Sequence, residues 1–442
     1  MRPTPLSGFP EFLPAGRIAE QAVLDSLRQS FELHGFTSVE TRAVETLEAL
    51  TRKGEIDKEV YGVRRVHAPE GSRDELGLHF DLTVPFARYV LEHAGHLLFP
   101  FRRYQIQKVW RGERPQEGRY REFVQADIDI VGENTLAAHH DIEVALVMLE
   151  ALTTLHTEFG IPPVTMHVNN RKLAEGFYLG LGIDQPTAVL QRIDKLDKIG
   201  RDPVQTLLTS ELGLTEPVAH LCLELATIQT SDTSFVERVR ALGVVHPLLD
   251  EGLAALAEVV TATSAVVPGR IIADLKIARG LDYYTGTVYE TEMAGFESLG
   301  SICSGGRYDA LATDGKRTYP GVGISVGVTR ILGPLINRGA LTAARAVPTC
   351  VLVAVDSEES RAEAMRVAAL LRGRGIPTEV APKADKFGKQ IRYADRRGIP
   401  FVWFSDGSVK DIRSGEQVAA SAASWQPPEG DLRPTVRTTP TA

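Results

Sequence analysis

The chain has 442 residues, of which 43% are hydrophobic and 24% charged, an ordinary composition for a folded protein of two or three domains. Its formal net charge of −8 argues against indiscriminate nucleic-acid binding, which needs many lysines and arginines, and we expect no DNA partner. The three cysteines form no close pair, and neither a signal peptide nor an apolar run of about 18 residues is present, so we expect a cytoplasmic protein without a disulfide framework or a membrane partner.

The N-terminal part of the chain mixes helical and extended patterns. Apolar residues at helical spacing predict a helix over 20–34, and an extended segment follows over 36–44. Residues 78–131 show mostly period-two alternation, which predicts strands. A long apolar-rich helix is then predicted over 135–156, and a strand over 164–168.

The pattern becomes almost wholly helical between 171 and 261, which predicts a helical module inserted between strand-rich stretches. Strands are predicted again at 270–275 and 286–292, before a glycine-rich stretch and a helix start within 305–335. A linker is expected at 344–348.

The C-terminal part has a strand, helix, strand, helix, strand order, which predicts a small domain with a largely parallel sheet. These elements are expected at 351–355, 360–374, 378–381, around Lys389 and at 401–404. The last stretch, 426–442, is rich in proline and threonine and is expected to be disordered. The domain boundaries that follow are 1–170 with 262–338, 171–261, 347–425 and the tail 426–442.

Residues 121–130, REFVQADIDI, alternate apolar and polar side chains, so a strand here has one core face and one face with Gln125, Asp127 and Asp129. Taken alone, that polar face is more simply explained as a solvated outer face of the sheet. The preceding segment 101–121 alternates too, then passes into a Gly- and Pro-containing loop, and it holds seven basic and two acidic residues. Local positive charge rich in arginine is typical of phosphate recognition.

Four segments share the order and spacing of one family's motifs. FRRYQIQKVWRGERPQEGRYREFVQADIDIVG (101–132) resembles motif 2 of class II aminoacyl-tRNA synthetases in its histidyl form, and RGLDYYTGTVYE (279–290) is similar to the signature peptide of histidyl enzymes. GGRYDALATDGKRTYPGVGISVGVTR (305–330) resembles motif 3, and FDLTVPFARY (80–89) resembles the substrate-binding turn. The resemblance covers nearly the whole chain, from about Phe12 to Gln417.

The resemblance implies an α+β catalytic core with an antiparallel sheet flanked by helices, a helical insertion, and a C-terminal α/β anticodon-binding domain. It implies an enzyme that activates histidine with ATP, releases pyrophosphate, and transfers histidine to the 3′ end of tRNA(His). A homodimer is also implied, because motif 1 of class II enzymes builds one. The run ETRAVE departs from that motif, with Arg42 where proline is usual.

Residue roles follow from the resemblance position by position. Arg111 matches the motif 2 arginine that contacts the α-phosphate and the histidine carboxylate, Arg279 matches a second residue on the α-phosphate, and Arg330 matches the motif 3 arginine on the γ-phosphate. Magnesium is expected on the β- and γ-phosphate oxygens, with Glu113 as the nearby carboxylate. The remaining metal ligands stay undetermined.

The histidine contacts match a second set of positions. Those around the substrate ammonium group are Asp81, Thr83, Gln125 and Asp129, with Asp81 where many bacterial members carry glutamate. Tyr283 and Tyr284 match positions that line the imidazole pocket, although without the motif they read equally as sheet-packing residues. A pocket that pairs both ring nitrogens rejects other amino acids by leaving buried polar groups unpaired, so no editing domain is required.

Transfer RNA is expected to contact two regions. Arg114 and Gln116 match positions in the motif 2 loop that approach the acceptor end. Residues 372–397 contain eight basic and three acidic residues in the domain expected to read the anticodon, although a solvated amphipathic helix explains that run as well.

Two other functions fit parts of this pattern. A synthetase-like regulatory subunit that senses histidine would bind without ligating, but such proteins usually lose the C-terminal domain and motif arginines that are present here. A class II enzyme for proline, threonine or glycine would share the core, but the run RGLDYYTG argues against it. Pyrophosphate exchange with each amino acid separates all three functions.

Overall fold

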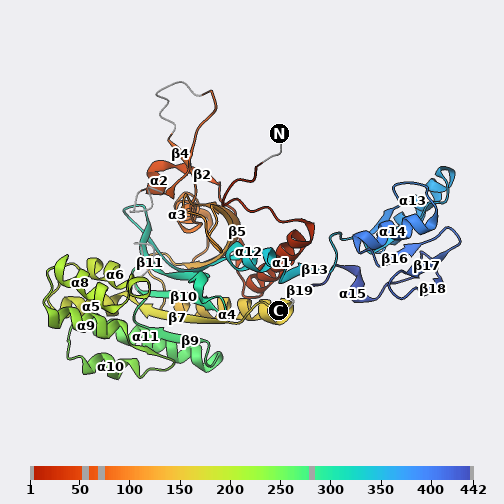
Figure 1. The fold of residues 1–442 in the computed structure, drawn as a ribbon. Coiled ribbons are helices and arrows are strands. Elements are labelled where there is room, and N and C mark those ends of the chain that lie inside the picture. The colour runs from red at the N-terminus through yellow and green to blue at the C-terminus, as the bar shows by residue number, and fades with distance from the viewer. Residues whose placement is uncertain (1–3, 52–58, 68–74, 278–283, 439–442) are drawn as a thin grey trace. The chain divides into compact units, whose positions relative to one another are not determined.

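The computed structural model describes residues 4–51, 59–67, 75–277 and 284–438, which form two compact units (Figure 1). The first unit contains Leu24–Thr157 and Ile161–Pro334 together with the N-terminal segment up to Pro10. The second contains Glu11–Val23, Glu158–Gly160 and the chain from Leu335 onward. None of the helices in the described parts of the chain combines the length and apolar character that crossing a bilayer requires.

A nine-stranded mixed sheet forms the centre of the first unit. Its strands, in spatial order, are β1 (Thr37–Ser38), β5 (Phe101–Trp110), β6 (Glu122–Val131), β12 (Thr318–Gly327), β11 (Cys303–Thr313), β10 (Thr287–Met293), β7 (Val164–Asn170), β9 (Ile271–Asp274) and β8 (Gln229–Thr230). Every pairing from β5 to β7 is antiparallel, whereas β1 pairs with β5 and β7 with β9 in parallel. The expected antiparallel sheet is therefore confirmed, with parallel strands added beyond β5 and β7.

One face of this sheet packs against α4 (His139–Phe159). Asp141 near the start of α4 anchors the contact, because its carboxylate lies 2.7 Å from the Arg307 guanidinium and accepts a 2.7 Å hydrogen bond from the Thr287 hydroxyl. The Tyr289 hydroxyl donates to the backbone oxygen of Asp141 at 2.8 Å. The inward apolar residues of β6 and β12, such as Ile128 and Ile324, are completely or almost completely buried here.

The N-terminal elements differ in part from the predicted ones. The first helix, α1 (Pro14–Leu33), begins six residues before the predicted 20–34. The strand prediction for 78–131 is wrong in its first part, where β4 (Leu76–Leu78) is followed by α3 (Thr83–His93). Leu82, Phe86 and Val90 are four residues apart and buried, a helical spacing that the alternating pattern of the flanking strands obscured. Smaller elements here are β2 (Val44–Thr46), α2 (Leu47–Thr51), β3 (Gly62–Val63) and the 3-10 turn η2 (Ala94–His96).

The predicted helical insertion is present between β7 and β9. It contains α5 (Arg171–Gly180), α6 (Pro186–Ile193), α7 (Leu196–Ile199), α8 (Arg201–Ser210), α9 (Glu216–Ala226), α10 (Phe235–Ala241) and α11 (Pro247–Val266), with the short β8 among them. Two glycines allow α5 and α11 to approach closely. A Cβ at Gly176 would lie 2.2 Å from the Leu249 nitrogen, and one at Gly252 would lie 2.2 Å from the Leu173 nitrogen. After the insertion, the described elements follow in the order β9, β10, η3 (Glu297–Leu299), β11, β12 and α12 (Val328–Asn337).

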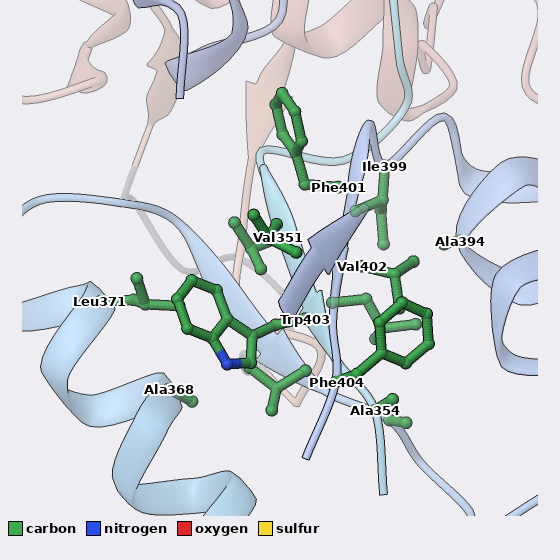
Figure 2. Close-up of a cluster of buried hydrophobic side chains, with 14 of the residues drawn as sticks. Val351, Ala354, Ala368, Leu371, Ala394, Ile399, Phe401, Val402, Trp403 and Phe404 are labelled. Atoms are coloured by element: carbon green, nitrogen blue, oxygen red, sulfur yellow. The ribbon is translucent and has the colours of Figure 1, made fainter. Parts of the chain in front are cut away.

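The second unit has its own five-stranded sheet, in the order β15-β14-β16-β17-β18. Its parallel strands are β14 (Val351–Val353), β15 (Thr378–Val380) and β16 (Phe401–Trp403), with η4 (Glu358–Ser360), α13 (Arg361–Gly373) and α14 (Phe387–Arg397) between them. This is the predicted order, to which β17 (Ser408–Asp411) and β18 (Gln417–Ala419) add an antiparallel edge. Figure 2 shows its core, where Val351, Trp403 and Leu371 pack between the sheet and α13.

The prediction of disorder over 426–442 is wrong for its described part, 426–438. A short helix, α15 (Glu429–Leu432), precedes β19 (Val436–Thr438), which pairs antiparallel with β13 (Leu341–Ala343). Val436 is buried, and the Thr438 hydroxyl donates to the Gly160 oxygen at 2.9 Å. Composition indicated a tail that cannot form a core, but β13 supplies the backbone partners that this segment lacks alone. Residues 439–442 lie outside the described residues.

Candidate active site

The sheet face opposite α4 carries a row of polar and small residues on neighbouring strands. Arg103 on β5 pairs with Asp129 on β6, Asp129 with Gly323 on β12, and Gly323 with Gly306 on β11. Directly paired residues point to the same side of a sheet, so their side chains share this face. The solvated alternative for β6 is wrong, because Asp129 is only 2% exposed and the same face remains buried along the strand.

A fully buried guanidinium lies at the centre of this face. Arg103 Nη2 is 2.7 Å from Asp129 Oδ2 and 3.8 Å from Asp127 Oδ2, and the same group donates to the Leu82 backbone oxygen at 3.3 Å. Arg103 Nη1 donates to Gln105 Oε1 at 3.2 Å, and the guanidinium carbon lies 4.3 Å from the centroid of the Phe86 ring, a cation–π contact. Sequence reading counted this arginine only as part of a basic run.

Burial and like charge make this cluster electrostatically unusual. Burial raises the pKa of Asp129 from 3.8 to about 7, because it outweighs the nearby Arg103 charge and is reinforced by Asp127 and Asp81. Burial likewise raises the pKa of Asp127, against the lowering effect of Arg103. Asp127 and Asp129 thus share the buried Arg103 guanidinium, and the charge of Asp81 adds to theirs, which favours the arrival of a further positive charge.

Four of the predicted histidine contacts come together here. Gln125 Nε2 donates to both oxygens of Asp127, at 2.9 and 3.1 Å. Asp81 follows β4, is buried, and accepts a 3.1 Å hydrogen bond from the Val84 backbone nitrogen at the start of α3. Thr83 is the first residue of α3 and is also buried, and the charge of Asp81 acts on Asp129. These residues therefore form one polar pocket where α3 meets the sheet.

Glycines form the floor of this pocket. A Cβ at Gly323 would lie 2.1 Å from Asp129 Oδ1, and a Cβ at Gly306 would lie 2.9 Å from the Tyr284 ring. Gly323 and Gly306 are cross-strand partners, so the Asp129 carboxylate and the Tyr284 ring lie over adjacent positions. The Tyr308 hydroxyl donates to Asp129 Oδ1 at 2.8 Å. Tyr283 and Arg279 lie outside the described residues.

Arginines gather at the other end of the same face. Arg111 follows β5, and its Nε donates to the Phe80 backbone oxygen at 3.0 Å, next to Asp81. Arg330 on α12 donates to the Leu299 oxygen, but its Nε is buried and has no hydrogen-bond partner among the described residues. Burial, together with the positive charges of Arg119 and Arg111, lowers the pKa of Arg330 to about 10. The charges of Arg119 and Arg111 therefore both act on Arg330, and a cluster of guanidinium groups of this kind suits an anion.

Two carboxylates accompany these arginines. Glu113 lies 3.4 Å from Arg119 and 3.9 Å from Arg111. Burial and the charge of Glu113 raise the pKa of Glu59, against the lowering effects of Arg111 and Arg119. The sequence motifs indicated Glu113 but neither Glu59 nor a role for Arg119. Glu59 and Arg119 are far apart in the sequence, and only the fold brings them together.

The loop between β5 and β6 is partly closed. Gln116 and Arg119 exchange two backbone hydrogen bonds, at 3.2 and 2.9 Å. The Arg114 and Gln116 side chains are exposed, and the chain turns through Gly118 at φ +72°. Glu117 is exposed as well. The predicted acceptor-end residues are therefore apart from the buried pocket and accessible to a large ligand.

One further group of potential metal ligands lies at the start of α4. His139, His140 and Glu143 have donor atoms within 4.8 Å of one another. Arg102 already binds the Glu143 carboxylate, with Nη2 3.1 Å from Oε2, and His140 Nδ1 lies 2.9 Å from the same oxygen. The carboxylate is thus held in an ion pair, and this group lies away from the arginines and carboxylates described above.

The second unit has a pocket of its own, of about 330 Å³. It lies between α14 and the segment after β16, and Phe387 and Phe404 form its aromatic wall with ring centroids 4.9 Å apart. The polar lining consists of Ser405, Asp406, Lys410 and Gln417. Flat aromatic surface beside polar groups suits an unstacked nucleobase.

Comparisons with family models, with curated proteins and with solved structures all indicate the same family. Residues 8–331 match the family model described as histidyl-tRNA synthetase, and residues 349–414 match the model for an anticodon binding domain. The histidine–tRNA ligases of Cutibacterium acnes and Micrococcus luteus are 66% and 60% identical to this chain, and each alignment covers 98% of both proteins. A crystal structure of histidyl-tRNA synthetase from Nostoc aligns with a TM-score of 0.82 at 35% identity, over 96% of this chain and 97% of that one.

The raised pKa of Asp129 predicts a pH-dependent stability. The unfolded chain releases this proton near pH 3.8 and the folded chain near pH 7, so folding stability contributed by the protonated form is lost as the pH rises between those values. We expect the free energy of unfolding of the wild type to fall, relative to Asp129→Asn, between pH 5 and pH 7.5 by about 1 kcal/mol or more. Urea denaturation of both proteins at several pH values measures this difference in the free energy of unfolding. The exposed Asp184→Asn is the control, and parallel curves for wild type and Asp129→Asn would contradict the assignment.

Proposed function

This chain belongs to the histidyl-tRNA synthetase family and is a histidine–tRNA ligase, and from that premise we propose how its residues bind histidine, ATP and transfer RNA. One observation carries the proposal. A single sheet face has a buried, carboxylate-rich pocket at one end and converging arginines at the other, and Arg111 connects the two through its hydrogen bond to Phe80, next to Asp81. An amino acid with a cationic end and a carboxylate would lie across that junction.

The pocket beside α3 is the proposed histidine site. Asp81, Thr83, Gln125 and Asp129 would receive the substrate ammonium group, since acceptor oxygens dominate there. Tyr284, and Tyr283 by the sequence resemblance, would contact the imidazole ring over the glycine floor. A pocket that pairs both ring nitrogens would leave polar groups unpaired when any other side chain enters, which would give discrimination without editing.

The arginine end is the proposed ATP site. Arg111 and Arg279 would hold the α-phosphate and Arg330 the γ-phosphate, and the structure adds Arg119 to this group through its charge interaction with Arg330. The histidine carboxylate attacks the α-phosphorus, a mixed carboxylic–phosphoric anhydride bond forms, and the bond between the α-phosphorus and the departing pyrophosphate breaks. The carboxylate is already ionised at neutral pH, so positioning and neutralisation of charge on the phosphoryl oxygens supply the catalysis.

Magnesium fits the same end of the site. Glu113 and Glu59 provide hard oxygen donors, and their mutual repulsion would be relieved by a divalent cation. We propose that Glu113, with Glu59 nearby, helps to hold the metal. When bound, the ion offsets negative charge on the β- and γ-phosphate oxygens.

The second step transfers histidine to RNA. The terminal ribose hydroxyl attacks the carbonyl carbon of the adenylate and AMP leaves. Arg114 and Gln116 are the proposed contacts to the acceptor end, which their exposure in the β5–β6 loop allows. In the second unit, we propose that the Phe387–Phe404 pocket receives one unstacked anticodon base, because aromatic faces bind bases by stacking.

The domains and assembly follow from the same assignment. We propose 1–170 with 262–338 as the catalytic domain, 171–261 as the insertion and 347–425 as the anticodon-binding domain, acting in the cytoplasm where translation consumes charged tRNA. We also propose a homodimer, supported by the resemblance to class II enzymes, in which motif 1 builds one, and by Leu98 of the first unit, which is 89% exposed. Light scattering at micromolar concentration should give twice the 48.3 kDa chain mass, and a monomer mass would refute it.

ATP–pyrophosphate exchange tests the site assignment directly. We expect exchange with histidine and not with proline, threonine or glycine. Arg330→Met should raise the KM for ATP about tenfold or more, since a charged hydrogen bond contributes about 1.5–3 kcal/mol, and should leave the KM for histidine nearly unchanged. The matched control is Arg338→Met, an exposed arginine just beyond the end of α12. Equal kinetics for the two variants would remove Arg330 from the ATP site.

The anticodon pocket has an independent test. Phe387→Ala should raise the KM for tRNA(His) in aminoacylation about five-fold or more, because stacking of one base contributes about 1–3 kcal/mol. Pyrophosphate exchange should stay at the wild-type rate, since that reaction involves no tRNA. Leu370→Ala on α13, which removes another exposed apolar side chain of the same unit, serves as the control. An unchanged KM for tRNA in Phe387→Ala would refute the pocket.

A further inference from the structure

We propose that Arg103 and Asp127 form a buried positioning pair beneath the histidine site, which orients Asp129 and Gln125 and sets the charge that the site demands from its ligand. This inference rests on the proposed role of Asp129 and Gln125 as histidine contacts. It assigns to Arg103 and Asp127 a function in substrate selection rather than contact with substrate. Neither residue was singled out by the motif resemblance.

Geometry shows that the pair shapes its neighbours. Arg103 is completely buried and spreads its guanidinium over Asp129, the Leu82 oxygen and Gln105, so the Asp129 carboxylate is held from below at 2.7 Å. Tyr308 holds the other carboxylate oxygen at 2.8 Å. With both oxygens bonded, Asp129 has one orientation over Gly323.

Asp127 acts on the second contact. Both of its oxygens accept from Gln125 Nε2, at 2.9 and 3.1 Å. The Gln125 amide nitrogen is thus committed to the pair, which leaves Oε1 as the atom of that amide able to accept from an ammonium group. Asp127 is completely buried and therefore acts through Gln125.

Among the described residues, the charges that face this cluster do not balance. Negative groups come from β6 (Asp127 and Asp129) and from the turn before α3 (Asp81), whereas Arg103 on β5 is the buried cation. The neighbouring polar groups are Tyr308 on β11 and Ser325 on β12, and the Arg111 charge reaches Asp127 from the end of β5. A substrate ammonium supplies a second positive charge, so its arrival favours the ionised form of Asp129. Histidine binding should then tighten as the pH rises towards and through 7.

Removing Arg103 and removing Asp127 should shift the pH dependence of histidine binding in opposite directions. Arg103→Met removes the cation, so Asp129 holds its proton to higher pH. Asp127→Asn removes a repelling charge, so Asp129 loses its proton at lower pH. The acidic limb of the pH profile of kcat/KM for histidine should therefore move to higher pH, by about one unit or more, in Arg103→Met. In Asp127→Asn the same limb should move to lower pH. The imidazole of free histidine titrates equally in every assay and does not affect the difference.

Steady-state kinetics separate orientation from charge. Arg103→Met should raise the KM for histidine about tenfold or more while the KM for ATP changes little, since a buried charge pair loses one partner. Arg103→Lys keeps the charge but cannot reach all three acceptors, so its KM for histidine should rise while its acidic limb stays near the wild-type position. Arg102→Met is the matched control, because Arg102 lies one residue away and binds Glu143 instead.

The outcomes distinguish this inference from the proposed site. Shifts of the acidic limb in the same direction, or none in Asp127→Asn, would overturn the inference, as would equal histidine KM values for Arg103→Met and Arg102→Met. If Arg103→Met does not fold, as judged by circular dichroism, Asp127→Asn and Arg103→Lys still decide it. If the wild type catalyses histidine-dependent pyrophosphate exchange and Asp129→Asn has the same kinetic constants, the proposed histidine site itself is wrong.

Discussion

The buried ion pair between Arg103 and Asp129 is the interaction on which the site depends. A carboxylate removed from water is unstable unless it is paired and hydrogen-bonded, and Asp129 meets that requirement through Arg103 and Tyr308, on two different strands. These contacts exist only if β5, β6, β12 and β11 keep one register, because a slip by one residue would turn every side chain to the other face. The opposite face fixes that register through its apolar residues and through Asp141 of α4.

The same register produces a gradient of charge along one sheet face. Carboxylates collect where α3 covers the sheet, and arginines collect where β5 ends and α12 begins. Each group is unfavourable by itself, as the raised pKa of Asp129 and the lowered pKa of Arg330 indicate. A zwitterionic amino acid beside a polyphosphate, placed as we propose, would relieve both, since its ammonium would enter the negative end and the phosphates would enter the positive end.

Much of this arrangement was predictable from local sequence. Alternation along 121–130 placed Gln125 and Asp129 on one strand face, and hydrophobic spacing gave the insertion helices and the C-terminal parallel strands. The helix at Thr83–His93 was missed because its residues lie between two strongly alternating stretches. The tail was judged on composition, whereas its β19 is stabilised by a partner strand nearly a hundred residues earlier in the chain.

The unpredicted members of the site have a common property: their roles come from partners distant in sequence. Arg103 looks like one cation of a phosphate-binding run, yet its neighbour Arg102 faces Glu143 and Arg103 faces Asp129, because adjacent residues on a strand point to opposite faces. The two-residue period of β5 therefore places the basic residues of one run on opposite faces of the sheet, where they have different partners. The arginines nearest the loop are the ones that we propose for phosphate, whereas Arg103, deeper in the sheet, pairs with the buried carboxylates of Asp127 and Asp129. Counting charges along the chain cannot show which arginine lies on which face, because the register of the sheet determines it.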